Sequence, residues 1–221
     1  SISFTPSVKA AQTRHGSREA YREAELAEDP RNEITQREAE FIAERDSFYM
    51  ATVSAHGWPY VQHRGGPAGF LKVLDSRTIG FADFRGNRQY LSVGNLSDDN
   101  RVSLILMDYA NRARLKLFGR VRIVPRDEDP ELMARLAVPG YRAVVQRAVI
   151  ITVEGYDWNC PQHIPQRFEA ADVQAAIALR DRRIESLEKR AKAGKLDEEQ
   201  EAELERLRKQ LRGMAGTERK E

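Results

Sequence analysis

The stretch YVQHRGGPAGFLKVLDSRTIGFADFRGNRQYLSVGNLSDDNRVSLILMD, residues 60–108, carries the pattern that decides the fold. Short segments rich in Val, Leu, Ile and Phe alternate there with two basic, glycine-containing turns, His63–Pro67 and Phe84–Gln89. Arginine supplies forked, charge-assisted donors, and glycine lets a backbone approach a ligand closely. The second turn is expected to open a helix, whose first N–H groups have no acceptor within the helix. The stretch therefore predicts a site for a phosphorylated cofactor.

The β pattern continues on both sides of this stretch. The segments predicted as strands are 48–53, 58–62, 70–74, 78–82, 101–107, 113–124 and 148–156. Expected helices cover about 35–45, 87–96 and 130–137, the first with Thr35 and Glu38 in a capping-box pattern and the last with Pro130 in its first turn. Six or seven short antiparallel strands with few helices between them indicate a mainly β chain with peripheral α-helices, folded as a small barrel.

The composition changes at both ends of the strand-rich region. We expect residues 1–34 to form an N-terminal helical extension, with a polar helix over 17–28, residues 35–170 to form the barrel domain, and residues 171–221 to form a C-terminal helical hairpin or short coiled coil. In the last segment Ile177, Ile184 and Leu187 fall near heptad spacing. Gly194 is a helix stop, and Asp197 with Gln200 is a capping-type start for a second helix. The many charges of this hairpin are typical of a solvated face.

Composition limits the class of protein. The chain has 221 residues, with 36 Lys plus Arg against 34 Asp plus Glu, a net charge of +2, and the charges are mixed along the sequence. This argues against nucleic acid as a partner. The single Cys160 excludes an internal disulfide, and we find neither a secretory pattern nor an apolar run long enough to cross a membrane. We expect a cytoplasmic protein with no membrane partner.

The sequence shows no motif for metal or nucleophilic catalysis. The four histidines, His15, His56, His63 and His163, are scattered without zinc-type spacing, and no Ser-His-Asp signature is present. We therefore expect no metal site. Cys160 has no cationic neighbour in sequence that would favour a thiolate, so we interpret it as inert.

Four segments together resemble one known family. They are His63-Arg64, IGFADFRGNRQY at 79–90, DNRVSLIL at 99–106 and WNCPQHIPQR at 158–167. In order and spacing they resemble the pyridoxamine 5'-phosphate oxidase-like flavoproteins, the FMN-binding split-barrel group, over roughly residues 39–167. The resemblance implies a split β-barrel and a homodimer with FMN in the cleft between the two subunits.

The resemblance also implies roles for residues in the first turn and the strand that follows. Arg64 matches the arginine that reaches the flavin and its phosphate, with Gln62 and His63 beside it and able to face the ring. Ala82 and Asp83 match the strand end whose backbone borders the ring. His63 also has a purely structural interpretation, which is the commoner one for a lone histidine.

The second turn matches the family's phosphate-binding Ser-Arg-Lys run. Asn87, Arg88 and Gln89 stand at those positions, so Asn replaces Ser and Gln replaces Lys, and one cationic contact is missing. Arg85 or Lys72 could supply that charge. Arg85 and Arg88 could instead only cap and pair on a polar surface. We expect the next two residues, Tyr90 and Leu91, to belong to the core.

The segment after the last predicted strand combines prolines with many hydrogen-bonding side chains, which is typical of a loop over a ligand. In the family the corresponding segment brings a Trp and an Arg to the flavin from the partner subunit. Trp158 and Arg167 are the candidates, with Gln162 and His163 as further ring contacts. The family's terminal Arg-x-His-x-Arg spacing is absent, so oxidation of vitamin B6 itself is not expected.

These observations predict an FMN-dependent oxidoreductase acting on an unidentified small molecule. Flavin performs hydride or electron transfer itself, so no protein nucleophile or acid pair is required. Two alternatives stay open. The protein could carry or sense flavin, or haem, without turnover, or it could be an assembly module that works through its C-terminal helices.

Overall fold

The computed structural model describes residues 2–22, 25, 31–158 and 160–215. The chain divides into two compact units, Ser1–Gln166 and Arg167–Glu221. No helix within these described ranges is long and apolar enough to span a bilayer.

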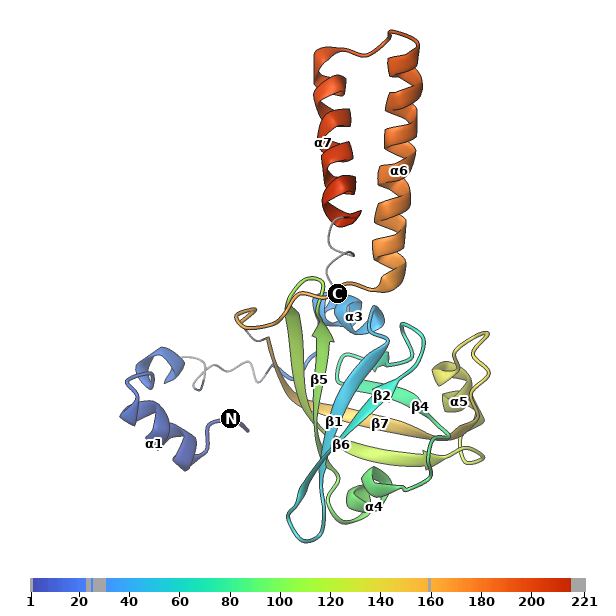
Figure 1. The fold of residues 1–221 in the computed structure, drawn as a ribbon. Helices are drawn as coiled ribbons and strands as arrows, with labels where there is room; N and C mark the ends of the chain where they lie inside the picture. Colours follow the sequence, from blue (N-terminus) through green and yellow to red (C-terminus); the bar gives the residue numbers. More distant parts are fainter. Residues whose placement is uncertain (1, 23–24, 26–30, 159, 216–221) are drawn as a thin grey trace. The chain divides into compact units, whose positions relative to one another are not determined.

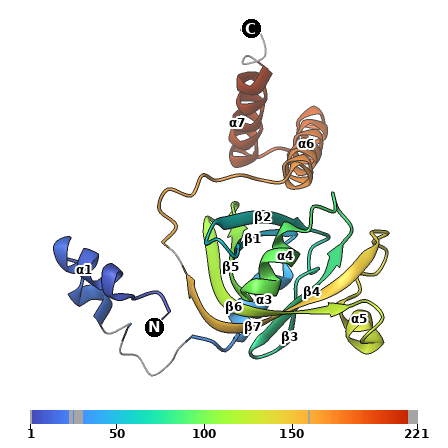
Figure 2. The same ribbon diagram turned by 90° about the horizontal axis from the view of Figure 1, so that it is seen from below.

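A single seven-stranded antiparallel sheet forms the centre of the first unit (Figure 1). Its strands are β1 Ser47–Val53, β2 Pro59–Gly65, β3 Lys72–Asp75, β4 Thr78–Phe84, β5 Arg101–Asp108, β6 Ala113–Pro125 and β7 Val145–Trp158. Their order across the sheet is β2-β1-β5-β6-β7-β4-β3, and the sheet curls into a split barrel (Figure 2). The prediction of a mainly β chain with flanking helices is thus confirmed.

Alternation along the strands fixes which side chains face the barrel interior. In β5, Val102, Leu104 and Leu106 are buried while the residues between them are more accessible. Their interior faces meet those of β6, where Leu115 and Leu117 are fully buried. Residues two apart on a strand share a face, so a period of two in the sequence gives one apolar layer inside the barrel.

Gly119 permits the close approach of β6 and β7. The register between these strands shifts at Phe118/Gly119. A Cβ at Gly119 would lie only 2.5 Å from the carbonyl oxygen of Thr152. Any other residue would force the two strands apart, because the obstacle is backbone.

Three helices accompany the sheet: α3 Gln36–Ala43, α4 Leu91–Asp98 and α5 Pro130–Leu136. The capping box that begins α3 is confirmed, and Asp129 caps α5 with Pro130 in its first turn. In the two views α3 lies at one end of the barrel and α4 at the opposite end (Figures 1 and 2). The two ends of the barrel therefore carry different helices.

Among the predicted boundaries, two element starts lie two or more residues too early in the chain. The helix expected from Asn87 begins only at Leu91, because Arg88 (φ 61°) and Tyr90 (φ 54°) adopt left-handed backbone conformations that an α-helix excludes. The strand expected from Phe70 begins at Lys72. Phe70 is instead buried in a turn, in which its N–H donates to the carbonyl of Pro67.

The N-terminal segment contains α1 Pro6–Arg14, capped by Thr5, and a short 3-10 helix, Glu19–Tyr21. The polar helix expected over residues 17–28 lies partly outside the described residues; in the described part, the 3-10 turn is followed by helical backbone at Arg22 and Glu25.

The second unit is an antiparallel hairpin of α6 Ala170–Lys192 and α7 Glu198–Ala215. The predicted stop is confirmed, since Gly194 has φ 64° directly after α6. The predicted start is also confirmed, because the Asp197 carboxylate accepts the Gln200 N–H at 2.9 Å. Ile184, Leu187 and Leu204 form the small apolar core between the helices.

Candidate functional site

A polar pocket of about 240 Å³ lies at the end of the barrel that carries α4. Strands β2 and β4, the 86–90 turn, α4 and the start of β7 all contribute to it. Its lining residues are Gln62, Arg64, Asp83, Phe84, Gly86, Asn87, Arg88, Tyr90, Ser92, Val93 and Gln146. Five of the residues singled out in the sequence meet here: Gln62, Arg64, Asp83, Asn87 and Arg88.

The alternation of β2 decides which of its residues reach the pocket. Gln62 and Arg64 pair with Met50 and Phe48 of β1, both buried, so they face the barrel interior. His63, between them, points to the other face, where its ring packs edge-on against Tyr49 with centroids 5.5 Å apart. His63 therefore does not line this pocket.

An ion pair crosses the gap at which the sheet fails to close. Strands β2 and β4 are not neighbours in the ladder, yet Arg64 Nη1 donates to Asp83 Oδ1 at 2.6 Å. The Arg64 side chain is 14% exposed and that of Asp83 is 7% exposed. The curl of the sheet thus brings two predicted site residues, 19 positions apart, into one buried contact.

The start of α4 borders the pocket through Tyr90, Ser92 and Val93. Tyr90, in a left-handed conformation, is the N-cap of α4, and no side chain caps this helix end. Helix N–H groups that lack a partner favour an anion, and the helix dipole adds to that preference. Strained backbone at Arg88 and Tyr90 is typical of functional turns.

Hydrogen bonds hold α4 rigidly against the barrel. Ser92, 1% exposed, donates from its hydroxyl to Gln62 Oε1 at 2.7 Å. Asn95 Nδ2 donates to Thr52 Oγ1 at 3.0 Å, and Thr52 is also 1% exposed. Because the Ser92 and Thr52 hydroxyl groups are buried and hydrogen-bonded, these contacts hold the pocket wall formed by α4 and β2 in place.

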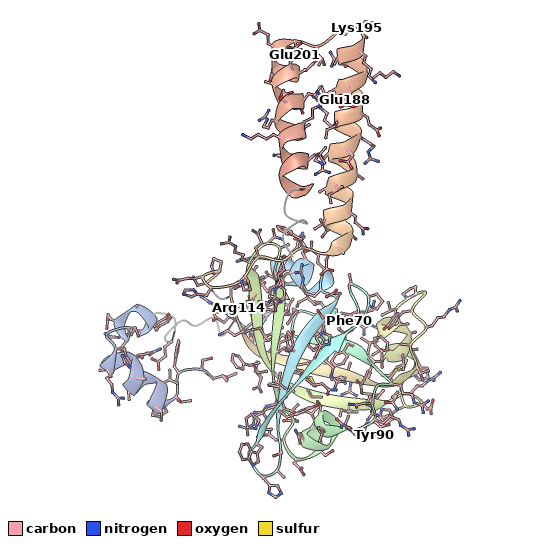
Figure 3. All side chains as sticks on the ribbon, in the orientation of Figure 1. Phe70, Tyr90, Arg114, Glu188, Lys195 and Glu201 are labelled. Carbon is pink, nitrogen blue, oxygen red and sulfur yellow. The ribbon has the colours of Figure 1, made fainter. Side chains whose placement is uncertain are left out.

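Sequence reasoning missed several pocket residues, of which Tyr90 and Gln146 are the clearest. Tyr90 was expected in the core but is 43% exposed and borders the pocket (Figure 3 labels it beside α4). Its hydroxyl accepts a hydrogen bond from Gln146 Nε2 at 3.1 Å. Gln146 lies two residues before the predicted start of its strand, and no local sequence signal places it opposite Tyr90.

The remaining candidates of the first half of the chain are not among the residues that line this pocket. Ala82 is buried in β4, and Lys72 begins β3. Arg85 is exposed, with its N–H donating to the carbonyl of Val144. Gln89 is held by Asn87, whose Oδ1 accepts the Gln89 N–H at 3.1 Å.

Trp158 lies against α3. Its indole N–H donates to Glu38 Oε1 at 2.7 Å, its ring meets Phe41 edge-on, and the Arg37 guanidinium lies 4.4 Å from its centroid. Burial raises the pKa of the Glu38 carboxyl, but hydrogen bonds from Thr35 and Trp158 outweigh burial and hold the pKa below its ordinary value. Trp158 thus anchors the end of β7 to α3 within its own chain.

The 160–167 segment is accessible over most of its length. Gln162 and His163 are exposed, and Ile164 is the residue that is buried. Gln166 Nε2 donates to the carbonyl of Ala110 at 2.8 Å, which fixes the end of the segment to the barrel. Arg167 begins the second unit. Within the described residues no three His, Cys, Asp or Glu side chains gather as metal ligands would.

A family model matches the sequence over the strand-rich region. The family model for pyridoxamine 5'-phosphate oxidase matches residues 34–157, more than half of the chain. This match covers the whole sheet except the last residue of β7. No curated protein matches the sequence.

Several solved structures resemble the chain. HupZ from Group A Streptococcus shares 18% identity and a TM-score of 0.47, over 61% of this chain and 99% of its own. A putative pyridoxamine 5'-phosphate oxidase from Lactobacillus delbrueckii shares 17% identity and a TM-score of 0.45, over 57% and 94%. HutZ, the heme storage protein of Vibrio cholerae, shares 17% identity and a TM-score of 0.38, over 57% and 94%. At these levels the similarity says nothing of ligand or reaction.

Proposed function

The chain belongs to the pyridoxamine 5'-phosphate oxidase family, and from this membership and the pocket we propose that it binds FMN beside α4 and acts as an FMN-dependent oxidoreductase on a small molecule. The observation that carries the proposal is the convergence of Arg64, Arg88 and the uncapped start of α4 on one pocket.

The residues present fit a phosphate group. Arg64 Nε is shielded from solvent and has no hydrogen-bond partner in the described part of the chain. A buried donor without an acceptor is costly, and a ligand oxygen would remove that cost. Arg88 and the N–H groups of α4 add further donors, so the phosphate would not depend on the cation lost where Gln89 replaces Lys.

The residues also fit the polar edge of a flavin ring. The Ser92 hydroxyl occupies Gln62 Oε1, which leaves the Gln62 amide nitrogen as a donor toward the pocket. Bound FMN supplies the hydride or electron transfer, and the chain supplies binding and orientation. We assign no side chain a proton-transfer step.

We further propose that the site is completed by a second copy of the chain. The pocket is smaller than the roughly 300–1,000 Å³ typical of ligand sites. The outward face of β2, β1, β5 and β6 carries Val61, Tyr49, Ile105 and Phe118 in adjacent registers, and Val61 is 60% exposed. Accessible apolar side chains gathered on one sheet face favour an interface. In such a dimer Gln162, His163 and Arg167 are candidates to reach the partner's flavin, whereas Trp158, expected from the family resemblance to do so, is held against α3 by Glu38 and Phe41.

The proposal is tested by titrating the protein with FMN and then adding NADH or NADPH without oxygen. Loss of flavin fluorescence on binding and bleaching of the flavin band on reduction support an oxidoreductase. Binding without reduction by either nucleotide favours a carrier or sensor. Absence of binding contradicts the proposal.

The dimer is tested with Val61→Arg, which places a charge on the outward face. We expect a shift to monomer in sedimentation and a loss of FMN affinity. Val8→Arg, a change at an exposed position of α1, is the matched control. A Val61→Arg protein that stays dimeric with normal FMN affinity contradicts this part of the proposal.

A further inference from the structure

Asp83 lies between two arginines that come from different strands. Arg64, on β2, donates to Asp83 Oδ1 at 2.6 Å. Arg147, on β7, lies directly opposite Asp83 in the β4–β7 register, and its Nε is 3.3 Å from Asp83 Oδ2. The Arg147 guanidinium also lies 5.1 Å from the centre of the Tyr90 ring. Arg64, Asp83 and Arg147 thus form one contiguous cluster at the wall of the pocket.

The cluster holds more donors than acceptors. Its two arginine side chains are 14% and 17% exposed, and one carboxylate faces both of them. Arg64 Nε is shielded from solvent and forms no hydrogen bond with the residues that the structure describes, and the equally shielded Arg147 Nε has the 3.3 Å ion-pair contact with Asp83 but no hydrogen bond among those residues. Excess positive charge with unsatisfied donors in a buried setting is unfavourable unless an anion joins it.

Asp83 itself lines the pocket, whereas Arg147 does not. An unpaired carboxylate on a pocket wall would repel a phosphate. Paired on both sides by guanidinium groups, the same carboxylate instead fixes the orientation of the arginine that faces the pocket. Fixing a long side chain in advance reduces the conformational entropy lost when a ligand binds.

We propose that Asp83 is a positioning residue that aims Arg64 at the phosphate of the bound nucleotide, and that Arg147 is part of this site because its charge offsets the Asp83 carboxylate. This inference rests on the proposed function and deepens it. It assigns a role to the Asp83 side chain, and it adds Arg147 to the residues that determine preference for a phosphorylated flavin.

The test compares the dissociation constants of FMN and riboflavin, which differ only by the phosphate. The variants are Asp83→Asn, Arg147→Gln and Arg147→Lys, each checked for folding by circular dichroism. Arg120→Gln is the control, since Arg120 is a half-exposed arginine of β6 that pairs with Glu154 outside the pocket. The ratio of the two constants reports on the phosphate and cancels general damage to the site.

We expect the wild-type protein to prefer FMN. Arg147→Gln should lower the preference about tenfold, because the Asp83 carboxylate would then repel the phosphate more strongly, and Arg147→Lys should keep most of it because the charge remains. Asp83→Asn should also lower the preference. If Asp83 only added negative charge, its removal would raise the preference, and that result overturns the positioning role.

The failure of this inference can be distinguished from the failure of the proposed function. A wild-type protein that binds neither flavin overturns both. A wild-type protein that prefers FMN, with Asp83→Asn and Arg147→Gln at the wild-type ratio, overturns this inference alone. Equal losses in Arg147→Lys and Arg147→Gln also overturn it, because charge would then not be what Arg147 supplies.

Discussion

Two buried carboxylates, Glu38 and Asp83, sit at different places in the barrel unit and differ in their partners. Glu38, 3% exposed, accepts from the backbone N–H of Thr35 at 3.2 Å and from the Trp158 indole at 2.7 Å. Each of the two carboxylate oxygens of Glu38 thus has a neutral donor. Asp83, 5% exposed, faces two guanidinium groups that keep unsatisfied donors.

The difference shows how a structural polar cluster can be separated from a binding one. Where donors and acceptors match, as at Glu38, the cluster ties elements together and needs nothing more. Where buried donors are left over, as around Asp83, a further acceptor is expected. Burial alone does not distinguish the two, because both carboxylates are almost fully enclosed.

The largest expected effect that tests this difference is the loss of FMN affinity in Arg64→Ala. The variant removes the donor that faces the pocket, so we expect FMN affinity to fall about 10- to 100-fold, as for the loss of a hydrogen bond to a charged group. Titration by flavin fluorescence measures the change. Arg101→Ala, at an exposed arginine of β5, should leave FMN affinity unchanged. Equal affinities for both variants would contradict the assignment of Arg64.

The opposite pattern, a loss of stability without a loss of FMN affinity, is expected for Glu38→Gln. The change weakens the charge-assisted bonds from Thr35 and Trp158, and the free energy of unfolding should fall by about 1–3 kcal/mol. FMN affinity per folded molecule should be retained. Urea denaturation and FMN titration of the same preparation measure the two quantities. A loss of FMN affinity with an unchanged free energy of unfolding would mean that the Glu38 cluster serves binding and not structure.

A smaller expected effect is on the pH dependence of thermal stability. The pKa of Glu38 is held below its ordinary value of 4.5, so its ionised form stabilises the folded state. That contribution is fully present above about pH 4.5 and is lost as the pH falls through the lowered folded-state pKa. The difference in Tm between the wild type and Glu38→Gln should therefore be constant above this pH and shrink below it. A difference that grows toward acid pH would contradict the assignment.

The smallest effect is expected in the C-terminal hairpin. Arg183 and Glu203 form an exposed ion pair between α6 and α7, so Arg183→Ala should hardly change stability and should leave FMN binding intact. Deletion of residues 172–221 sharpens this test. Retained FMN binding with loss of a protein partner would support the alternative that the hairpin is an assembly module.

Local patterns in the sequence were enough to predict much of the fold. Alternation predicted the strands, and the Thr35, Gly194 and Asp197 signals predicted helix ends, because each acts within a few residues. The late start of α4 was not predictable. Left-handed backbone at Arg88 and Tyr90 is uncommon for these residue types and has no local signature.

The candidate pocket was predictable only in part, because some of its contacts join residues that lie far apart in the sequence. The two turns and the family resemblance pointed to five residues that line the candidate pocket, Gln62, Arg64, Asp83, Asn87 and Arg88. Arg147 depends on the β4–β7 register, and the contact of Trp158 with Glu38 joins residues 120 positions apart. Such pairings are set by sheet closure and helix docking, which a local pattern does not encode.

The central claim is that the pocket beside α4 holds FMN through Arg64. Its most direct test is the visible absorption spectrum of the protein as purified from cells, with the released cofactor identified by mass, together with the same spectrum for an Arg64→Ala, Arg88→Ala double variant. We predict a flavin band and FMN in the wild type, and neither in the folded variant. A colourless wild type that also takes up no added FMN would contradict the claim.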